Sequence, residues 1–422
     1  MADRMIVLDR SLRLLAELVD ADHQAISEAL ERSRVLIRAG SALTSHPAET
    51  QAALATLLNV LVRSGLPVEL DLPTVPVATP LLPAGPLIVA LMQLGDHVLP
   101  GSVVEVTGAP CDLVLVVGPE VTREACRVMY LGADGDCAWF DATPAGWSPS
   151  NPLVALAAAG LAGGEAVRHA VRAYPPQSAW AVAALRPVAR AECLIPAMRR
   201  GSIDLGRLDI ISAGAVTDAV IWTLRAQGEV SGTARVFDDG AYDMTNLNRY
   251  MELDRTAAAA GMSKAVRIAR TSPSGLVVEP VERRFSEQDI ADAAPMIIVG
   301  ADDIAVRHTA QQAMPDWLGI GATSHNEARI TEHWPDGPCA GCAHPHLAAL
   351  PDEPIPTIAP VSFWAGFMLA VRMLRAATGG GHDGADAYAT YYPLVNPGRA
   401  EVGPCPFHPK CRLSARHREA AS

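Results

Sequence analysis

The chain has 422 residues, of which 50% are apolar, 5% aromatic and 19% charged, and its formal net charge at pH 7 is −12. Domains average roughly 150 residues, so this length predicts two or three of them. An acidic chain has no electrostatic attraction to a phosphate backbone, so we expect no nucleic-acid partner, and the abundance of Ala, Leu and Val favours helices that cover parallel strands.

The first residues of the chain predict a long helix followed by an extended connector. No proline interrupts a set of apolar residues at helical spacing, Leu8, Leu12, Leu15 and Val19. This pattern predicts a helix from residue 5 to about residue 40 and another over residues 52–64. Six prolines between residues 66 and 86 predict an extended connector without a helix. The charged residues 3–10 lack the pattern of a signal peptide, which favours a cytoplasmic protein.

The rest of the N-terminal region is predicted to be α/β. Short apolar runs bounded by Gly, Pro and Asp are typical of buried strands, and they occur at 103–107, 113–117 and 128–131. The alanine-rich stretch 151–168 predicts a helix whose glycines, Gly160, Gly163 and Gly164, allow another element to approach closely. The most apolar stretches, 152–164 and 361–374, are shorter than the roughly 20 residues that span a bilayer, so no membrane helix is expected.

A domain boundary is predicted near residue 195, which gives an N-terminal region of residues 1–194 and a C-terminal domain of residues 195–422. A proline-bearing stretch at 186–196 precedes a new alternation of strands and helices. Strands are predicted at 208–212, 234–238, 277–280 and 296–300. This βαβ order predicts a Rossmann-like parallel sheet with helices on both faces, preceded by a region that begins helical and continues as α/β. No internal repeat is found.

The first motif with chemical meaning is the turn after the strand that ends near Ser212. The run Ser212-Ala213-Gly214-Ala215-Val216-Thr217 opens a helix where a dinucleotide-binding fold presents backbone N–H groups to a phosphate. Gly214 alone remains of the usual three glycines, so the motif is weak by itself. The next strand ends about 25 residues later at Asp238, where this fold places an acid against a ribose hydroxyl.

Three further motifs follow in order. They are Thr245-Asn246-Leu247-Asn248-Arg249-Tyr250, Gly261-Met262-Ser263-Lys264 and, after a strand, Gly300-Ala301-Asp302-Asp303. Together with the glycine turn and the acid at the strand end, this order resembles the ThiF-type activating enzymes. That family includes the ubiquitin-activating enzymes and the molybdopterin-synthase activators, and the resemblance covers about residues 208–374.

The resemblance implies ATP- and Mg²⁺-dependent adenylation of the C-terminal carboxylate of a small ubiquitin-like protein or peptide, with transfer to sulfur or nitrogen as a further step. It implies a homodimer, and it gives Asp238 to the ribose, Asn246 and Arg249 to the phosphates, Lys264 to the transition state and Asp302 to Mg²⁺. The triphosphate charge must be neutralised for the attack, and the predicted catalytic residues are Arg249 and Lys264, which supply positive charge, and Asp302, which would bind Mg²⁺. The predicted nucleotide contacts are Gly214, Asp238, Thr245, Asn246, Arg249, Lys264 and Asp302.

Two departures from the family pattern keep other functions open. Gly240 stands where the family often has a second acid, and Ser212 and Thr217 replace the outer glycines. A non-catalytic ThiF-like scaffold in a biosynthetic or defence pathway is therefore one alternative. A nicotinamide-dependent oxidoreductase is another, although the Asn-Leu-x-Arg and Gly-x-x-Lys motifs argue against it.

The cysteines predict a structural zinc site near the C-terminus. Four thiolates suit tetrahedral Zn²⁺, and the candidate ligands are Cys339, Cys342, Cys405 and Cys411. The alternative is that one of these, or Cys193, accepts the activated acyl group as a thioester or persulfide. Lone cysteines are usually inert core residues, as expected for Cys111, Cys126 and Cys137. The neighbouring histidines are expected at the surface or behind the ligands; they are His344, His346 and His408.

Overall fold

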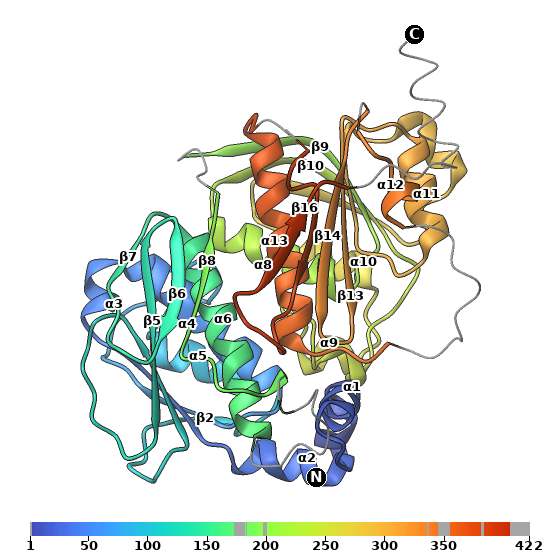
Figure 1. The fold of residues 1–422 in the computed structure, drawn as a ribbon. Helices are drawn as coiled ribbons and strands as arrows, with labels where there is room; N and C mark the ends of the chain where they lie inside the picture. Colours follow the sequence, from blue (N-terminus) through green and yellow to red (C-terminus); the bar gives the residue numbers. More distant parts are fainter. Residues whose placement is uncertain are drawn as a thin grey trace.

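The structure is a computed structural model that describes residues 2–172, 182, 184–196, 201–335, 337–344, 355–380 and 384–405. The N-terminal half, residues 1–194, and the C-terminal half, residues 195–422, each contribute one sheet. Figure 1 shows the two sheets on opposite sides of a group of helices. The predicted α/β class is therefore confirmed, and the boundary near residue 195 stays a prediction.

The N-terminal sheet has the order β3-β2-β1-β4-β5-β6-β8, with β7 beside β5. Its first five strands are parallel, and β6 and β8 run antiparallel to their neighbours. All five residues of the interior strand β4 are buried, as expected for a parallel strand covered on both faces. The strands are β1 (Val35–Ala39), β2 (Val68–Asp71), β3 (Val103–Glu105), β4 (Leu113–Val117), β5 (Arg127–Gly135), β6 (Cys137–Asp141), β7 (Trp147–Pro149) and β8 (Arg190–Leu194).

The C-terminal sheet has the order β11-β10-β9-β12-β13-β14-β15-β16. Its strands are β9 (Ile203–Ile211), β10 (Val230–Phe237), β11 (Leu276–Val281), β12 (Met296–Val299), β13 (Trp317–Ser324), β14 (Glu327–His333), β15 (Tyr388–Tyr391) and β16 (Ala400–Gly403). The first five are parallel and the last three antiparallel. In both halves the first strand lies in the middle of the five parallel strands. The second and third strands lie on one side of it, and the fourth and fifth lie on the other. The two halves therefore share one topology, although no internal repeat is found in the sequence.

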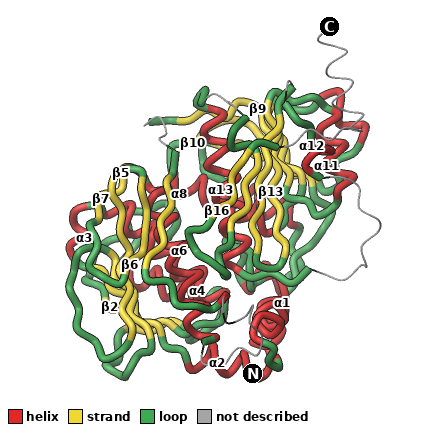
Figure 2. The backbone as a smooth tube through the Cα atoms, viewed as in Figure 1, coloured by secondary structure: helices red, strands yellow, loops and turns green. Residues whose placement is uncertain are grey.

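Helices cover the sheets, as Figure 2 shows in red. In the N-terminal half they are α1 (Ala2–Val19), α2 (His23–Arg32), α3 (Ser41–Ser45), α4 (Pro47–Arg63), α5 (Leu87–Asp96) and α6 (Pro152–Val171). In the C-terminal half they are α8 (Ala215–Gln227), α9 (Arg255–Ala259), α10 (Lys264–Thr271), α11 (Ile304–Gln312), α12 (Ala340–Ala343) and α13 (Ala359–Ala377), with 3-10 turns η1 (Met244–Asn246) and η2 (Glu287–Asp292).

Helices α4, α6, α8 and α13 pack against one another between the two sheets. A Cβ added at Gly160 of α6 would lie 2.6 Å from the Phe363 ring of α13, and one at Gly163 would lie 2.8 Å from Val60 of α4. The expected close approach at these glycines is therefore confirmed. One cluster of buried apolar residues runs from α1 to α13, so the two halves share a core.

The helix predicted over residues 5–40 is wrong. α1 ends at Val19 because Asp20 takes a left-handed conformation with φ 56°. Asp22 then caps α2 by accepting a hydrogen bond from the Ala25 N–H. Residues 35–39 form β1, the central strand of the N-terminal sheet, because burial between β2 and β4 overrides local helix propensity.

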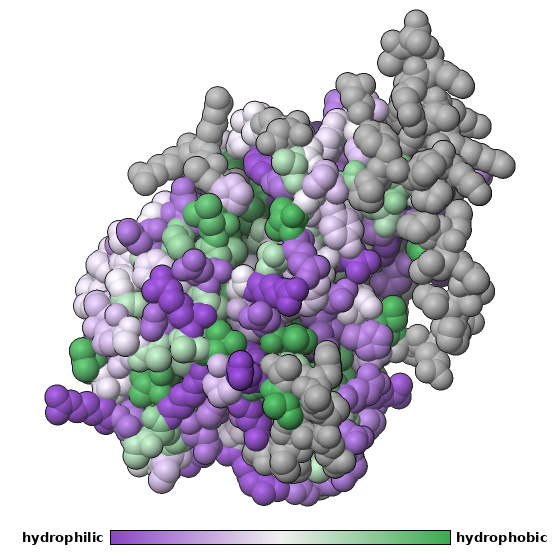
Figure 3. Space-filling model, viewed as in Figure 1, coloured by the Kyte–Doolittle hydropathy of each residue, from purple (hydrophilic) through white to green (hydrophobic). Residues whose placement is uncertain are grey.

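Residues 66–86 contain no helix, as predicted, but they include the strand β2. None of the described helices is long and apolar enough to cross a membrane. On the face drawn in Figure 3, hydrophobic residues form small patches among hydrophilic ones, which is ordinary for a protein surface.

Candidate nucleotide-binding site

A pocket of about 380 Å³ lies where β9, β10 and β12 end. The strand order reverses at this place, because the chain crosses from β9 to β10 on one side and to β12 on the other. Open α/β sheets bind ligands in the crevice outside the carboxyl ends of their strands at such a switch point. Three predicted site residues line this pocket, Asp238, Lys264 and Asp302.

The turn between β9 and α8 begins at the pocket, which is lined by Ile211 and Ser212. Ser212 lines it in a left-handed conformation with φ 73°, the region that glycine adopts without cost. Gly214 is the N-cap of α8, and a Cβ there would lie 3.3 Å from the Ser212 hydroxyl oxygen. The first N–H groups of α8 have no partner within the helix, so this turn suits an anion even with one glycine.

Asp238 ties the turns after β9 and β10 together. One of its carboxylate oxygens accepts the Ala213 N–H at 2.7 Å, and the other accepts the Gly240 N–H at 2.7 Å. Each carboxylate oxygen retains a second lone pair, so this side chain can still accept ribose hydroxyls. A Cβ at Gly240 would lie 2.9 Å from the Asp238 carboxylate and 3.3 Å from Lys264 Nζ, which explains a glycine at that position.

Lys264 stands at the start of α10. Its backbone N–H donates to Gly240 O at 3.0 Å, and its Nζ lies 5.8 Å from the centre of the Tyr250 ring. A cation over an aromatic face is attracted to it, so the ring helps to orient the ammonium group. Lysine is rare in this chain, since 2 of its 34 basic residues are lysines.

Asp302 and Asp303 follow β12 and take different roles. The Asp303 carboxylate accepts the Ala305 N–H at 2.8 Å and caps α11. Both aspartates are exposed and line the pocket, but only the Asp303 carboxylate forms this helix cap. Carboxylate oxygens are the ligands that Mg²⁺ prefers, so Asp302 suits the predicted role.

The remaining predicted residues lie outside the pocket lining. Arg249 is 5% exposed, donates to Thr245 O at 2.7 Å and to the Asn248 side-chain oxygen at 2.6 Å, and lies 5.3 Å from the Tyr250 ring centre. Burial lowers the pKa of Arg249 to about 10. Asn246 accepts the Asp243 N–H at 3.4 Å through its side chain. The structure thus gathers this segment and Lys264 around Tyr250.

Arg284 and Phe285 are among the lining residues that were not predicted from the sequence. Arg284 forms an ion pair with Asp239 at 3.0 Å, and Phe285 packs edge-on against Phe237 with ring centres 5.2 Å apart. Both follow β11, whose position was predicted. Parallel strands end at one edge of a sheet, so the residues after a third strand could have been added to the site.

The N-terminal half anchors the Asn-Leu-Asn-Arg segment, which was also not predicted. Arg63 of α4 is buried and donates to the carbonyl oxygens of Leu247 at 2.7 Å, Met251 at 3.1 Å and Leu253 at 2.7 Å. The Asn248 side chain donates to the Ser11 hydroxyl of α1 at 2.8 Å. Helices of one half therefore fix a segment beside the candidate nucleotide pocket of the other.

Three of the four predicted zinc ligands belong to one buried cluster, which holds Cys339, Cys342 and Cys405. The sulfurs of Cys339 and Cys342 lie 3.7 Å apart. Among the described residues, no group of three or more His, Cys, Asp or Glu side chains is arranged to hold a metal ion. Cys411, His346 and His408 lie outside the described residues, so zinc stays a prediction.

His344 is not at the surface, which was one of the two places expected for it, because it belongs to a buried network. Its ring contacts Arg307 at 3.0 Å and Thr331 at 3.0 Å, and Thr331 also contacts His333 at 2.9 Å. His333 Nδ1 lies 2.7 Å from Pro338 O. Both rings find partners as neutral imidazoles.

Acid is expected to destabilise the protein through His333. Burial lowers its pKa to about 4, whereas the unfolded value is about 6.5. The unfolded state therefore binds a proton first, and stability is lost as the pH falls from about 6.5 to about 4, by about 3 kcal/mol for this residue. Urea denaturation between pH 7 and pH 4 measures the loss. A His333→Gln variant that keeps the full pH dependence would contradict the assignment.

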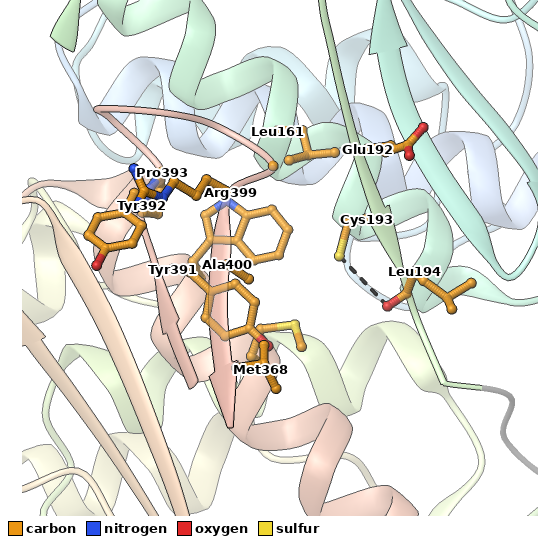
Figure 4. A pocket seen from close by; sticks show the side chains of 13 residues that line it. Leu161, Glu192, Cys193, Leu194, Met368, Tyr391, Tyr392, Pro393, Arg399 and Ala400 are labelled. Atoms are coloured by element: carbon orange, nitrogen blue, oxygen red, sulfur yellow. Dashed lines mark hydrogen bonds between the residues drawn. The ribbon is translucent and has the colours of Figure 1, made fainter. Parts of the chain in front are cut away.

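A second cavity of about 200 Å³ lies between α6, β8, α13 and the β15–β16 hairpin. Figure 4 shows Cys193 and Leu194 on one side of it and Tyr391, Ala400 and Met368 on the other. Burial raises the pKa of Cys193 to about 12, so its thiol is protonated at neutral pH and is a poor acyl acceptor. This cavity shares no lining residue with the nucleotide pocket.

No model of a known protein family matches the chain. A curated protein of Sinorhizobium fredii (strain NBRC 101917 / NGR234), described as the uncharacterized protein y4jF, is 31% identical over 147 residues, which are 33% of this chain and 28% of that protein. This chain therefore matches less than a third of that relative's length.

Solved structures are similar at low identity. E. coli MccB with MccA is 15% identical with a TM-score of 0.40, over 50% of this chain and 66% of MccB. E. coli MccB with ATP is 14% identical with a TM-score of 0.40, over 50% and 67%. PaaA is 14% identical with a TM-score of 0.37, over 47% and 64%. Likenesses of this degree carry no argument about activity.

Proposed function

We propose that this chain uses ATP and Mg²⁺ to adenylate the C-terminal carboxylate of a peptide or small ubiquitin-like protein. The observation that carries the proposal is the convergence of Asp238, Lys264 and Asp302 on one pocket at the switch point of the C-terminal sheet. These residues come from three separate motifs. The pocket volume of about 380 Å³ lies within the range of small-molecule sites.

The proposed reaction joins the carboxylate to the α-phosphate. A carboxylate oxygen attacks the α-phosphorus, the bond to the oxygen that bridges to the β-phosphate breaks, and pyrophosphate leaves with that electron pair. Negative charge increases at the leaving group, so a positive group held in place stabilises the transition state. Lys264 supplies that charge, the N-terminal N–H groups of α8 bind phosphate oxygens, and Asp238 holds the ribose.

Mg²⁺ bound at Asp302 would neutralise phosphate charge. Zn²⁺ held by Cys339, Cys342, Cys405 and Cys411 would tie the C-terminal segment to the sheet. The segment behind the pocket would be held in place by Arg249, Thr245 and Asn246. Arg249 would also keep a positive charge there. The N-terminal half would act as a structural partner, because Arg63 and Ser11 bind that segment. A homodimer remains a prediction of the resemblance.

Pyrophosphate exchange tests the proposal, with Asp302→Asn compared with Asp303→Asn. Both changes remove one charge from an exposed residue of the same loop, and asparagine still caps a helix well at position 303. We expect exchange that depends on Mg²⁺ and on a carboxylate substrate, and a loss of about 10²-fold in Asp302→Asn. An equal loss in Asp303→Asn would contradict the assignment of Mg²⁺ to Asp302.

The scaffold alternative has its own outcome in this experiment. The left-handed Ser212 in place of a glycine is the observation that favours it. A scaffold would show no exchange with peptides and small proteins encoded nearby, and no ATP binding by calorimetry. ATP binding without exchange would leave the nucleotide site in place and require a different carboxylate.

A further inference from the structure

Two thiols of the N-terminal half lie side by side. The sulfurs of Cys111 and Cys126 are 3.3 Å apart, and both residues are half-buried. They were expected to be inert core residues, but both retain access to solvent. Cys111 precedes β4 and Cys126 precedes β5, so the pair stands at the amino ends of two neighbouring strands.

The strand pairing sets the spacing of the two backbones. β4 and β5 are parallel, and Leu113 lies opposite Arg127. The pairing begins at these two residues, and Cys111 and Cys126 lie just before it in irregular backbone. Their sulfurs are 3.3 Å apart, whereas a disulfide bond is about 2.05 Å long, so the sulfurs must approach by about 1 Å to form the bond.

The surroundings hold both side chains in place. Each packs against the same apolar cluster on one face of the N-terminal sheet, Leu36, Val114, Val116, Tyr130 and Ala145. The segment before β4 is held to the segment before β1, where Asp112 accepts the Arg34 N–H at 2.9 Å. The segment before β5 is fixed by the ion pair of Glu124 with Arg38. The thiols are therefore brought together by the fold itself.

We propose that Cys111 and Cys126 are a redox-active pair that forms an intramolecular disulfide by exchange with a low-molecular-weight disulfide such as oxidised glutathione. The Cys111 thiolate attacks one glutathione sulfur, a Cys111–glutathione bond forms, and the first glutathione leaves as a thiolate. Cys126 then loses its proton to solvent and attacks the Cys111 sulfur. The second glutathione leaves, so two protein thiols are oxidised and two glutathione molecules are produced.

The order of attack follows from the environment of Cys126. Burial, the neighbouring Cys111 and the nearby Glu124 raise the pKa of Cys126 to about 12. The thiolate is the nucleophile in exchange, so the raised pKa slows a first attack by Cys126. Once glutathione is attached to Cys111, the attack by Cys126 on the Cys111 sulfur is intramolecular. This proximity compensates for the small thiolate fraction of Cys126.

Other cysteines of the described chain provide the comparison. Cys339 and Cys342 are separated by 3.7 Å but are 1% and 7% exposed, so an external disulfide reaches them less easily. Cys137 is half-buried like the pair. It serves as the matched control.

The experiment incubates the reduced full-length protein with oxidised glutathione under native conditions, blocks the remaining thiols and maps the linked peptides by mass spectrometry. We expect a Cys111–Cys126 link, loss of two thiols and a higher midpoint of thermal unfolding that dithiothreitol reverses. Cys111→Ser and Cys126→Ser should each abolish the link and that rise, and Cys137→Ser should keep both. An unresolved glutathione adduct on native Cys111, a link between other cysteines, or dimers on a non-reducing gel would overturn the proposal. The map of linked peptides in the wild-type protein tests the proposal without any variant.

Discussion

Replacing Lys264 with alanine is expected to lower the rate of substrate-dependent pyrophosphate exchange by about 10²–10³-fold, the usual cost of losing one preorganised group that stabilises developing charge. The ammonium group lines the nucleotide pocket and is oriented by the Tyr250 ring at 5.8 Å. The side chain belongs to the first turn of α10, so its loss removes charge without removing core packing. Exchange at saturating ATP, which isolates the chemical step, is the measurement.

The matched control is Arg270→Ala. Arg270 is exposed on the same helix, and its removal takes one positive charge from α10 without touching the pocket. A loss of exchange in both variants would mean that the effect comes from the overall electrostatic field of the helix. Full exchange in Lys264→Ala would remove this residue from the reaction. Urea denaturation of both variants checks that the fold is kept.

The nature of the pocket cation also bears on its role. This chain uses arginine almost everywhere, with 2 lysines among 34 basic residues, yet a lysine stands at the pocket. Arginine presents a planar fork, whereas the lysine ammonium is a compact point charge on a flexible stem. In the proposed reaction, a compact charge can follow the phosphate as the bond to pyrophosphate lengthens. Gly240 provides the space, because a Cβ there would lie 3.3 Å from Lys264 Nζ.

The sequence was informative where one rule of sheet geometry applies. Asp238 and Asp302 each follow a buried strand of the C-terminal sheet, and parallel strands end at one edge. Their positions on the chain therefore place them at the same edge of the sheet, and in the structure both line one pocket. The same rule would have added Arg284 and Phe285 after β11 had it been applied to the third strand.

The N-terminal half shows why the remaining features of the fold could not be predicted from the sequence. β1 was assigned to a helix because five residues carry too little pattern to outweigh the periodicity around them, and its place at the centre of a sheet depends on strands that follow it. The role of Arg63 was not predicted for a different reason. Its partners are backbone carbonyl oxygens 184 to 190 residues away. Every residue has a backbone carbonyl, so the sequence does not show which ones accept a hydrogen bond.

Replacing Arg63 with methionine is expected to lower the free energy of unfolding by about 3–5 kcal/mol, the usual cost of removing one partner from a buried charged network. The guanidinium group donates to three carbonyl oxygens and to the Asn59 side chain, all of them buried. Methionine fills much of the same volume, so the loss comes from unsatisfied acceptors. The nearby carboxylates Asp218 and Glu252 would also lose a compensating charge.

A control on the surface separates this effect from the loss of any arginine. Arg32→Met removes an exposed side chain that pairs with Glu28 at 2.6 Å, and exposed pairs contribute about 0–1 kcal/mol. Chemical denaturation of the two variants gives the comparison. At temperatures where Arg63→Met stays folded, we also expect a higher KM for ATP, because the carbonyls it releases belong to the segment that carries Arg249. An unchanged KM beside a large loss of stability would show that α4 supports the fold without positioning the nucleotide site.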